Sequence, residues 1–145
     1  HGNLEVGEND EAALFLVNEV FSKLDIPCVI AGNNPSMLLK QLVKKQENIQ
    51  LVENTTIDSI HHLIKEAQIN VLPTFQATGI KLKLINALFL GRHCVVNTPM
   101  IANTGLQDLC TVTKDANHMK AALESLFDKE ITAEDIQLRK NFARL

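Results

Sequence analysis

The chain has 145 residues and a formal net charge of −3, with 46% hydrophobic and 21% charged residues. These values are typical of one soluble globular domain with a core of ordinary size, and the negative charge argues against a nucleic-acid partner. No apolar run approaches the ~20 residues needed to span a bilayer, so we expect no transmembrane segment.

Short apolar runs alternate with helical patterns along the chain. In chain order, the first half predicts the end of a first strand at Gly2–Leu4, helix Asp10–Leu24, strand Ile26–Ile30, helix Ser36–Lys45, strand Ile49–Val52 and helix Thr55–Ala67. The second half predicts strand Ile69–Leu72, helix Ile80–Leu90, strand Cys94–Val96, helix Thr104–Leu109, strand Cys110–Val112, helix Asp115–Phe127 and a last helix after Thr132.

Polar residues at the start of these helices could cap them. Asn9 and Ser36 stand where an N-cap is expected, and Thr55 with Asp58 has the spacing of a capping box. Strict alternation of strands and helices predicts βαβ units with right-handed crossovers. The expected fold class is therefore α/β, a Rossmann-like three-layer domain whose parallel sheet has helices on both faces and Ile69–Leu72 at its centre.

The ends of the chain and its cysteines suggest its context. The first residues, HGNL, read as the interior of a strand, and the last residues still follow a helical pattern. We therefore expect residues 1–145 to be a single domain excised from a longer protein. The three cysteines, Cys28, Cys94 and Cys110, lie in separate apolar runs, which favours reduced core residues in a cytoplasmic protein over disulfides or a metal site.

The stretch from Ile69 to Gly91 carries the clearest functional signal. Pro73 has no N–H for a sheet and ends the strand, and Gly79 permits a tight entry into the next helix. A loop that leads from a strand into a helix directs several backbone N–H groups to the same point. The pattern predicts an anion site, most readily for a phosphate.

The helix that follows is apolar except for Lys81, Lys83 and Asn86, which predicts burial on nearly all sides. Lysines in the first turn oppose the helix dipole, and an anionic ligand would remove that penalty. At about 100° per residue, Lys83 and Asn86 share one side of the helix while Lys81 points elsewhere. We therefore expect ligand contact at Lys83 and Asn86. The alternative is that both lysines only extend from a buried helix into solvent.

Motifs of several other enzyme classes are missing. HGNL does not continue as G-x-G-x-x-G, which argues against a NAD enzyme, and no P-loop is present. His61 and His62 are adjacent on a predicted helix and point about 100° apart, so we expect surface histidines and no metal pair. Without a suggestive carboxylate pair or Ser/His/Asp set, no catalytic residue is assigned.

The central stretch VLPTFQATGIKLKLINALFLGRHCVVNT and the later NTGLQDL resemble the donor-binding segment of GT-B glycosyltransferases of the retaining group 1 family. The matching positions are Pro73, Gly79, Lys81, Lys83, Ala87, Gly91, Arg92, Val95, Gly105 and Leu106. HGNL and AGNNP also resemble that family's first two strand ends, so the resemblance covers most of the chain.

The resemblance implies that this chain is the carboxyl-terminal half of such an enzyme, the half that holds a nucleotide sugar as donor substrate without a further cofactor. The residues expected to hold it are Gly2, Asn3, Thr78, Gly79, Ile80, Lys83, Asn86, Thr104 and Gly105. The family usually carries two glutamates eight residues apart, and here Thr78 and Asn86 stand in their places. Asn86 could still bond a ribose hydroxyl, whereas Thr78 cannot supply charge at the sugar.

The implied function is transfer of a sugar from a nucleotide diphosphate to a glycan or a lipid-linked acceptor. The parent is expected to be a cytoplasmic protein of bacterial type that could be membrane-peripheral, with an amino-terminal acceptor-binding domain missing here. The fragment alone is expected to be inactive. Two alternatives stay open, a nucleotide-sugar epimerase domain and a non-catalytic GT-B-like binding module.

Overall fold

The computed structural model describes residues 1–76 and 81–143. Its strands are β1 (Cys28–Ala31), β2 (Ile49–Val52), β3 (Ile69–Leu72), β4 (His93–Asn97) and β5 (Thr111–Thr113). Its α-helices are α1 (Gly7–Phe15), α2 (Met37–Lys44), α3 (Ile57–Glu66), α4 (Leu82–Leu90), α5 (Thr98–Ile101), α6 (Ala116–Leu126) and α7 (Ala133–Ala143). A π-helical segment (Leu16–Val20) and a 3-10 turn (Phe21–Lys23) continue α1, and another 3-10 turn covers Gln107–Leu109.

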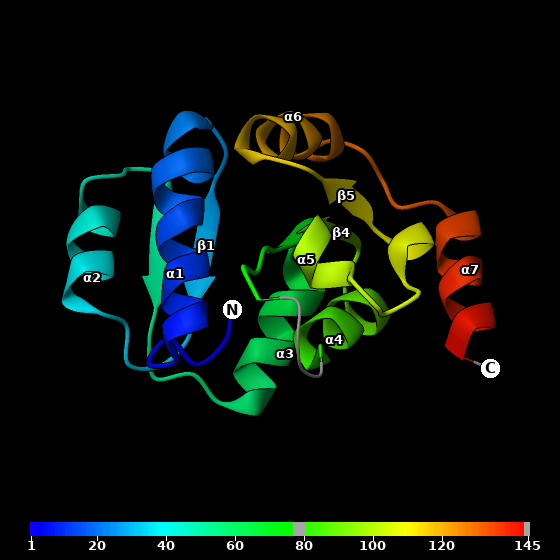
Figure 1. The fold of residues 1–145 in the computed structure, drawn as a ribbon, viewed down its shortest axis with the longest axis horizontal. Coiled ribbons are helices and arrows are strands. Elements are labelled where there is room, and N and C mark those ends of the chain that lie inside the picture. Colours follow the sequence, from blue (N-terminus) through cyan, green and yellow to red (C-terminus); the bar gives the residue numbers. More distant parts are fainter. Residues whose placement is uncertain (77–80, 144–145) are drawn as a thin grey trace.

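All strand pairs are parallel, and they form two sheets. β1 pairs with β2, while β4 lies between β3 and β5. Helices lie on both sides of the strands, with α6 on one side of β3–β5 and α3 and α4 on the other (Figure 1). This arrangement confirms the Rossmann-like α/β prediction.

Two apolar clusters hold the layers together. The larger one joins α1 and its π-helical continuation to α2, α6 and the strands, with Val17, Val20, Leu39, Val95 and Met119 at 0–1% exposure. The smaller one packs α4 against the opposite face of β3 and β4 through Leu84, Ala87, Leu88, Cys94 and Val96. Side chains of β4 enter both clusters because successive residues of a strand point to opposite faces.

The predicted first strand, Gly2–Leu4, is wrong. These residues run beside the end of β1, where the Gly2 N–H donates to the Ala31 carbonyl (3.1 Å) and the Leu4 N–H to the Asn33 carbonyl (3.0 Å), but they form no strand. In the part of the chain that the structure describes, no strand lies between β1 and β3. The prediction that Ile69–Leu72 is the centre of the sheet is wrong for the same reason, since β3 is an edge.

Several helix starts also differ from the prediction. α1 begins at Gly7, so Asn9 lies inside the helix and does not cap it. α3 is capped by Thr56 with Ser59, one residue later than the predicted pair, because the Thr55 N–H is already bonded to Asn33. The Ser36 cap of α2 is confirmed by a 3.1 Å bond from the Leu39 N–H. Helix α5 was not predicted, although Pro at its second position favours a helix start there.

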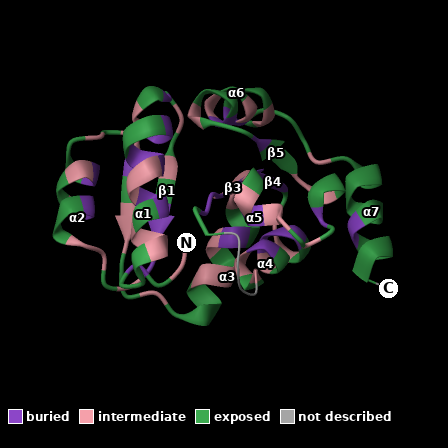
Figure 2. Cartoon of the chain, in the orientation of Figure 1, coloured by how far each residue is buried: buried purple, intermediate pink, exposed green. Residues whose placement is uncertain are grey.

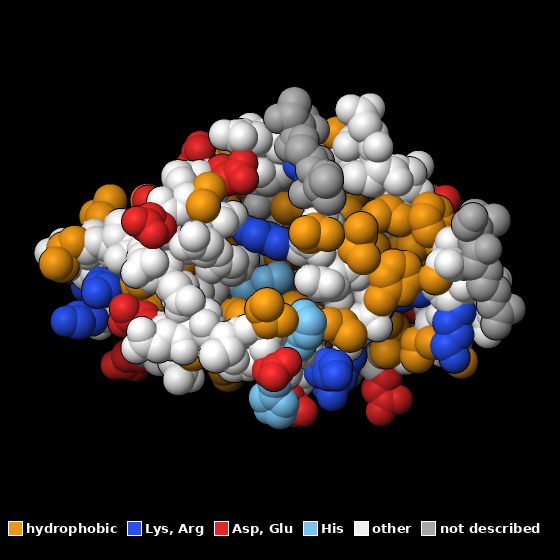
Figure 3. All heavy atoms as spheres, turned by 90° about the horizontal axis from the view of Figure 1, so that it is seen from below, with side chains coloured by type: hydrophobic (Ala, Val, Ile, Leu, Met, Phe, Trp, Pro, Cys, Tyr) orange, Lys and Arg blue, Asp and Glu red, His pale blue; other side chains and the backbone are white. Residues whose placement is uncertain are grey.

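Helix α4 is not buried on nearly all sides, contrary to the prediction. It carries both buried and exposed residues (Figure 2), and Leu82, Ile85 and Phe89 are 64%, 41% and 42% exposed. Hydrophobic side chains gather on the right-hand part of the face seen from below (Figure 3). The apolar composition of α4 therefore reflects one stripe that packs on the sheet and a second that faces outward.

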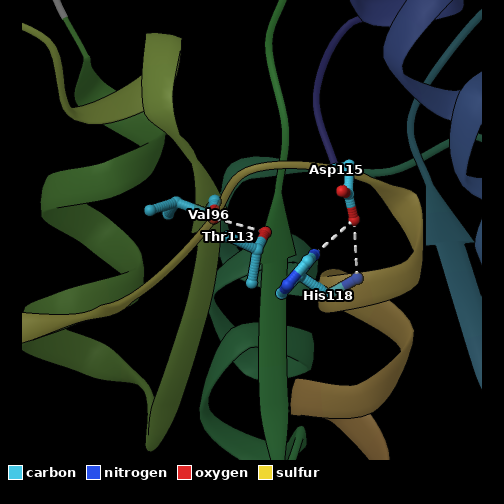
Figure 4. Close-up of polar contacts among 4 residues, drawn as sticks. All are labelled: Val96, Thr113, Asp115 and His118. Atoms are coloured by element: carbon cyan, nitrogen blue, oxygen red, sulfur yellow. Dashed lines mark hydrogen bonds and ion pairs between the residues drawn. The ribbon is translucent and has the colours of Figure 1, made fainter.

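A polar start fixes α6 beside the end of β5 (Figure 4). The Asp115 carboxylate accepts the His118 N–H at 2.8 Å and lies 2.7 Å from His118 Nδ1, which satisfies an unpaired donor of the first turn. Thr113, at the end of β5, donates from its hydroxyl to the Val96 carbonyl at 2.9 Å. The first contact caps α6, and the second joins the ends of β4 and β5.

The Asp115 cap should make stability depend on pH. Hydrogen bonds from the His118 backbone and then from its side chain lower the pKa of Asp115 below the usual 3.8. A depressed pKa adds stability that is present above the unfolded-state pKa and is lost as pH falls through the folded-state pKa. We expect Asp115→Ala to lower the melting temperature at pH 7, with the deficit shrinking between about pH 5 and pH 2.

Thermal melts across this pH range, with exposed Asp128→Ala as control, measure the effect. A deficit that is unchanged at pH 2 would show that the charge of Asp115 is not what caps α6.

Candidate functional site

The loops that follow the strands gather at one edge of each sheet, where parallel sheets usually bind ligands. Two asparagines tie neighbouring loops together there. Asn33, after β1, accepts the Thr55 N–H at 2.6 Å and donates to the Thr55 carbonyl at 3.0 Å. Asn97, at the end of β4, makes the same pair of bonds to Thr74 after β3, at 3.0 and 2.8 Å. Each amide uses its donor and its acceptor on one backbone residue, which holds the two loops in register.

Three segments that are distant in sequence meet at Lys83. This lysine lies in the first turn of α4, and its ammonium donates a hydrogen bond to Asn9 Oδ1 on α1. Asn9 in turn donates from Nδ2 to the Asn3 carbonyl at 2.8 Å. A Cβ at Gly2 would lie 2.7 Å from Lys83 Nζ, and the φ of Gly2, +144°, is a backbone conformation that favours glycine. The result is a cation held between the first residues of the chain and the start of α4.

The charge of Lys83 is poorly compensated at this position. Burial lowers the pKa of Lys83 below its usual 10.5, and the Glu8 carboxylate partly opposes that shift. The positive end of the α4 dipole acts in the same direction as burial. An anion beside Lys83 would relieve both penalties, which is the electrostatic basis of a phosphate site.

The other polar residues of α4 have different surroundings. Lys81 donates from Nζ to the Gln76 carbonyl at 2.9 Å, so it contacts the loop after β3 and not the first residues of the chain. Asn86 is half-buried and follows Lys83 by about one helical turn. The two lysines are both half-buried but contact different segments, and only Lys83 bonds to α1.

The structure brings together only some of the residues predicted for the site. Gly2, Asn3 and Lys83 meet, whereas Thr78, Gly79 and Ile80 lie outside the described residues. Thr104 donates from its hydroxyl to the Ile101 carbonyl at 2.7 Å and accepts the Leu106 N–H at 3.1 Å, which closes its own loop. Gly105 has a φ of +71°, a conformation that favours glycine whatever its function.

The sequence alone did not identify the polar groups around Lys83 and in the neighbouring loops. Asn9 was interpreted only as a helix cap, and Asn33 and Asn97 were not singled out. A usable signal was present, because Asn33 and Asn97 each stand at or just after the end of a strand with a loop to hold. Glu8 could have been found only from the fold, since its partner is 75 residues away in the sequence.

The described residues contain neither a cluster of metal ligands nor a membrane-spanning helix. Within residues 1–76 and 81–143, no three His, Cys, Asp or Glu side chains come together as metal ligands would. None of the helices that the structure describes has the length and apolar character needed to cross a membrane.

Comparison with known proteins gives one family and one fold. A sequence model of the family described as "Glycosyl transferases group 1" matches residues 1–129. No curated protein sequence gives a significant match. Among solved structures, 21 chains match, and at 10–13% identity the three described next are evidence of the fold alone.

All three solved structures are α,α-trehalose-phosphate synthases. The Burkholderia xenovorans enzyme (UDP-forming), in complex with glucose-6-phosphate, has a TM-score of 0.62 and 10% identity, over 95% of this chain and 36% of that one. The Burkholderia multivorans enzyme has a TM-score of 0.61 and 10% identity, over 99% and 37%. Another UDP-forming B. xenovorans structure has a TM-score of 0.56 and 13% identity, over 94% and 37%. The chain thus spans just over a third of the length of these structures.

Proposed function

The chain belongs to the group 1 family of glycosyl transferases, and we propose on that basis that it is the half of a two-domain enzyme that binds the nucleotide-sugar donor. In this proposal it is the carboxyl-terminal half of a retaining GT-B enzyme, and the nucleotide sugar is a substrate that needs no separate cofactor. The rest of the enzyme would supply the acceptor surface, so the chain alone would not transfer sugar.

The observation that carries the proposal is the position of Lys83. Its ammonium lies at the start of a helix, in contact with Asn9 and close to the backbone of Gly2. When a nucleoside diphosphate departs from the sugar, its phosphate gains negative charge. A fixed cation at a helix N-terminus stabilises that charge. In this arrangement Lys83 would contact the diphosphate, while Asn86, one turn later, would lie toward the ribose.

The similarity to UDP-forming enzymes supports a nucleoside diphosphate as the leaving group, since two of the solved structures carry that description. We propose a glycan or a lipid-linked molecule as acceptor. The parent would be a cytoplasmic, bacterial-type protein, able to associate with a membrane surface without spanning it.

One observation favours a second candidate, a binding module without catalysis. Asn86 stands where the resemblance places a glutamate, and an amide cannot carry the charge of a carboxylate. Such a module could keep the diphosphate contact at Lys83 and lose turnover.

Calorimetric titration of the chain with uridine diphosphate, guanosine diphosphate and uridine tests the proposal. We expect saturable binding of at least one diphosphate and binding of uridine at least about tenfold weaker, because a charged hydrogen bond contributes about 1.5–3 kcal/mol. Absence of saturable binding for both diphosphates would contradict a donor-binding domain.

A further inference from the structure

Two cysteines lie side by side at the amino ends of β4 and β5. These strands are parallel, and Val95 stands opposite Thr111. One step back in the same register, Cys94 stands opposite Cys110, which directly precedes β5 and has an extended backbone (φ −138°, ψ 167°). Neighbouring strands lie about 4.7–4.9 Å apart, which is within the Cα–Cα range of disulfides. The spacing of the two backbones therefore permits a disulfide between them.

The side chains of both cysteines face the same space. Residues that stand opposite each other on parallel strands point to the same face of the sheet. Cys94 belongs to the apolar cluster that packs α4 on the sheet, and Cys110 packs against that cluster. A cavity of about 110 Å³ between this end of the sheet and α7 is lined by both cysteines and by Arg139. All the cysteines are free thiols in this structure.

The two thiols differ in how easily a dissolved molecule reaches them. Cys94 is 2% exposed, whereas Cys110 is half-buried and donates from Sγ to the Leu106 carbonyl at 3.3 Å. Burial raises the pKa of Cys110 to about 11 and raises the pKa of Cys94 further. Because the thiolate is the nucleophile, both thiols react slowly, and a reagent from solution meets Cys110 first. Cys94 is placed to react second, with the sulfur of its neighbour.

The charges around the cavity favour sulfur chemistry over the binding of an anion. Arg139 is 7% exposed, and its buried Nε has no hydrogen-bond partner among the described residues. Its positive charge lowers the pKa of Cys110 against the effect of burial, as a cation beside a thiol does. Two carboxylates, Asp108 and Asp135, also line the cavity and would repel an anion there.

We propose that Cys94 and Cys110 form a dithiol site that a small disulfide, of the class of glutathione disulfide, oxidises to a disulfide between β4 and β5. The Cys110 thiolate attacks one sulfur of the small disulfide, whose S–S bond breaks to release one small thiol. The Cys94 thiolate then attacks Cys110 Sγ and releases the second small thiol. Two protein thiols are oxidised, one small disulfide is reduced to two thiols, and the two cysteine protons end on these.

The disulfide would fix the outer strand of the sheet. β5 has three residues, and in the described chain no strand lies on its other side. The new bond closes the segment from Cys94 to Cys110, and closing a loop of roughly 15 residues restricts the unfolded chain and so stabilises the fold. The site lies at the amino ends of the strands, opposite the edge that carries the proposed donor site, and its chemistry needs no nucleotide.

Cys28 provides a matched control within the chain. It is half-buried like Cys110, and burial raises its pKa to about 11 as well, but the residue opposite it on β2 is Ile49. The folded wild-type chain is incubated with glutathione disulfide at mildly alkaline pH, and its peptides are mapped by mass spectrometry. We expect Cys94 and Cys110 to be joined without retained glutathione, whereas Cys28 carries at most a mixed disulfide with glutathione.

Two variants separate the steps. In Cys94→Ala we expect Cys110 to retain glutathione, because the second thiol that would displace it is gone. In Cys28→Ser only the pair remains, and oxidation should raise the melting temperature by at least about 5 °C. Reduction with dithiothreitol should remove that increase.

The outcomes that would overturn the proposal are specific. They are glutathione retained on Cys110 of the wild type, a disulfide that includes Cys28, thiols of the pair that react only in denaturant, and an unchanged melting temperature after the pair is oxidised. The peptide map of the wild type needs no variant, so it decides the proposal even where a variant does not fold. Nucleotide binding is not a readout here, so the result stands apart from the proposed donor site.

Discussion

Lys83→Ala should weaken the binding of uridine diphosphate by about 1.5–3 kcal/mol, which is the range for a hydrogen bond to a charged group. The ammonium of the half-buried Lys83 lies beside Asn9 and Gly2 at the start of α4, where partial burial already lowers its pKa. A diphosphate bound there gains a charge-assisted contact in a partly desolvated place, and alanine removes it.

Lys81→Ala is the matched control for this variant, since Lys81 lies two residues earlier and donates to the Gln76 carbonyl on another segment. We expect its effect on affinity to be within about 0.5 kcal/mol. Calorimetric titrations of the wild type and both variants measure the difference. Affinities that are equal for the wild type and Lys83→Ala would show that this lysine does not hold the phosphate.

The second large effect is expected at Gly32. A Cβ at this position would lie 1.9 Å from the Gly2 carbonyl oxygen and 3.1 Å from its carbon, and both atoms belong to backbone that cannot rotate away. Gly32→Ala should therefore lower the free energy of unfolding by about 1–3 kcal/mol, the usual cost of overpacking, or push residues 1–4 off β1. Displacement of residues 1–4 would also move Gly2 away from Lys83, which should weaken nucleotide binding.

Gly7→Ala supplies the control for Gly32→Ala. Gly7 is the first residue of α1, and a Cβ there would meet nothing within 4 Å. In a helix the same change is expected to stabilise by up to about 0.5–1 kcal/mol. Urea unfolding of the two variants measures the contrast, and a Gly32→Ala protein as stable as Gly7→Ala would contradict the close approach of Gly2 to Gly32.

The order of secondary-structure elements was predictable because buried strands and amphipathic helices leave different periods in the sequence. The bounds of β2 and β3 were predicted to the residue, and the parallel arrangement followed from strict alternation. The predicted first strand was wrong because Gly2 and Leu4 each donate a single backbone hydrogen bond to the end of β1 and the loop after it, and the composition of HGNL cannot show how many such bonds it makes. The outward stripe of α4 was missed because an apolar helix gives no sign of which apolar face is covered.

The candidate site was predictable in part, for a related reason. Lys83 could be singled out, since a lysine at a helix start opposes the dipole in any fold. Its contact with Asn9 and Gly2 could not, because it depends on how the first residues cross the sheet. The hydrogen bonds that Asn33 and Asn97 make to neighbouring loops likewise depend on the tertiary structure, because they join residues 22 and 23 positions apart in the sequence.

The most direct test of the account is to map where a nucleoside diphosphate binds. Uridine diphosphate titrated into the isotope-labelled chain, followed by amide NMR, reports the affected residues. We expect the largest saturable shifts at Gly2, Asn9 and Lys83 and their sequence neighbours, and we expect the same shifts to be absent from Lys83→Ala. Shifts that cluster instead at the far end of the sheets, around Arg139 and Cys110, would contradict a donor site at the start of α4.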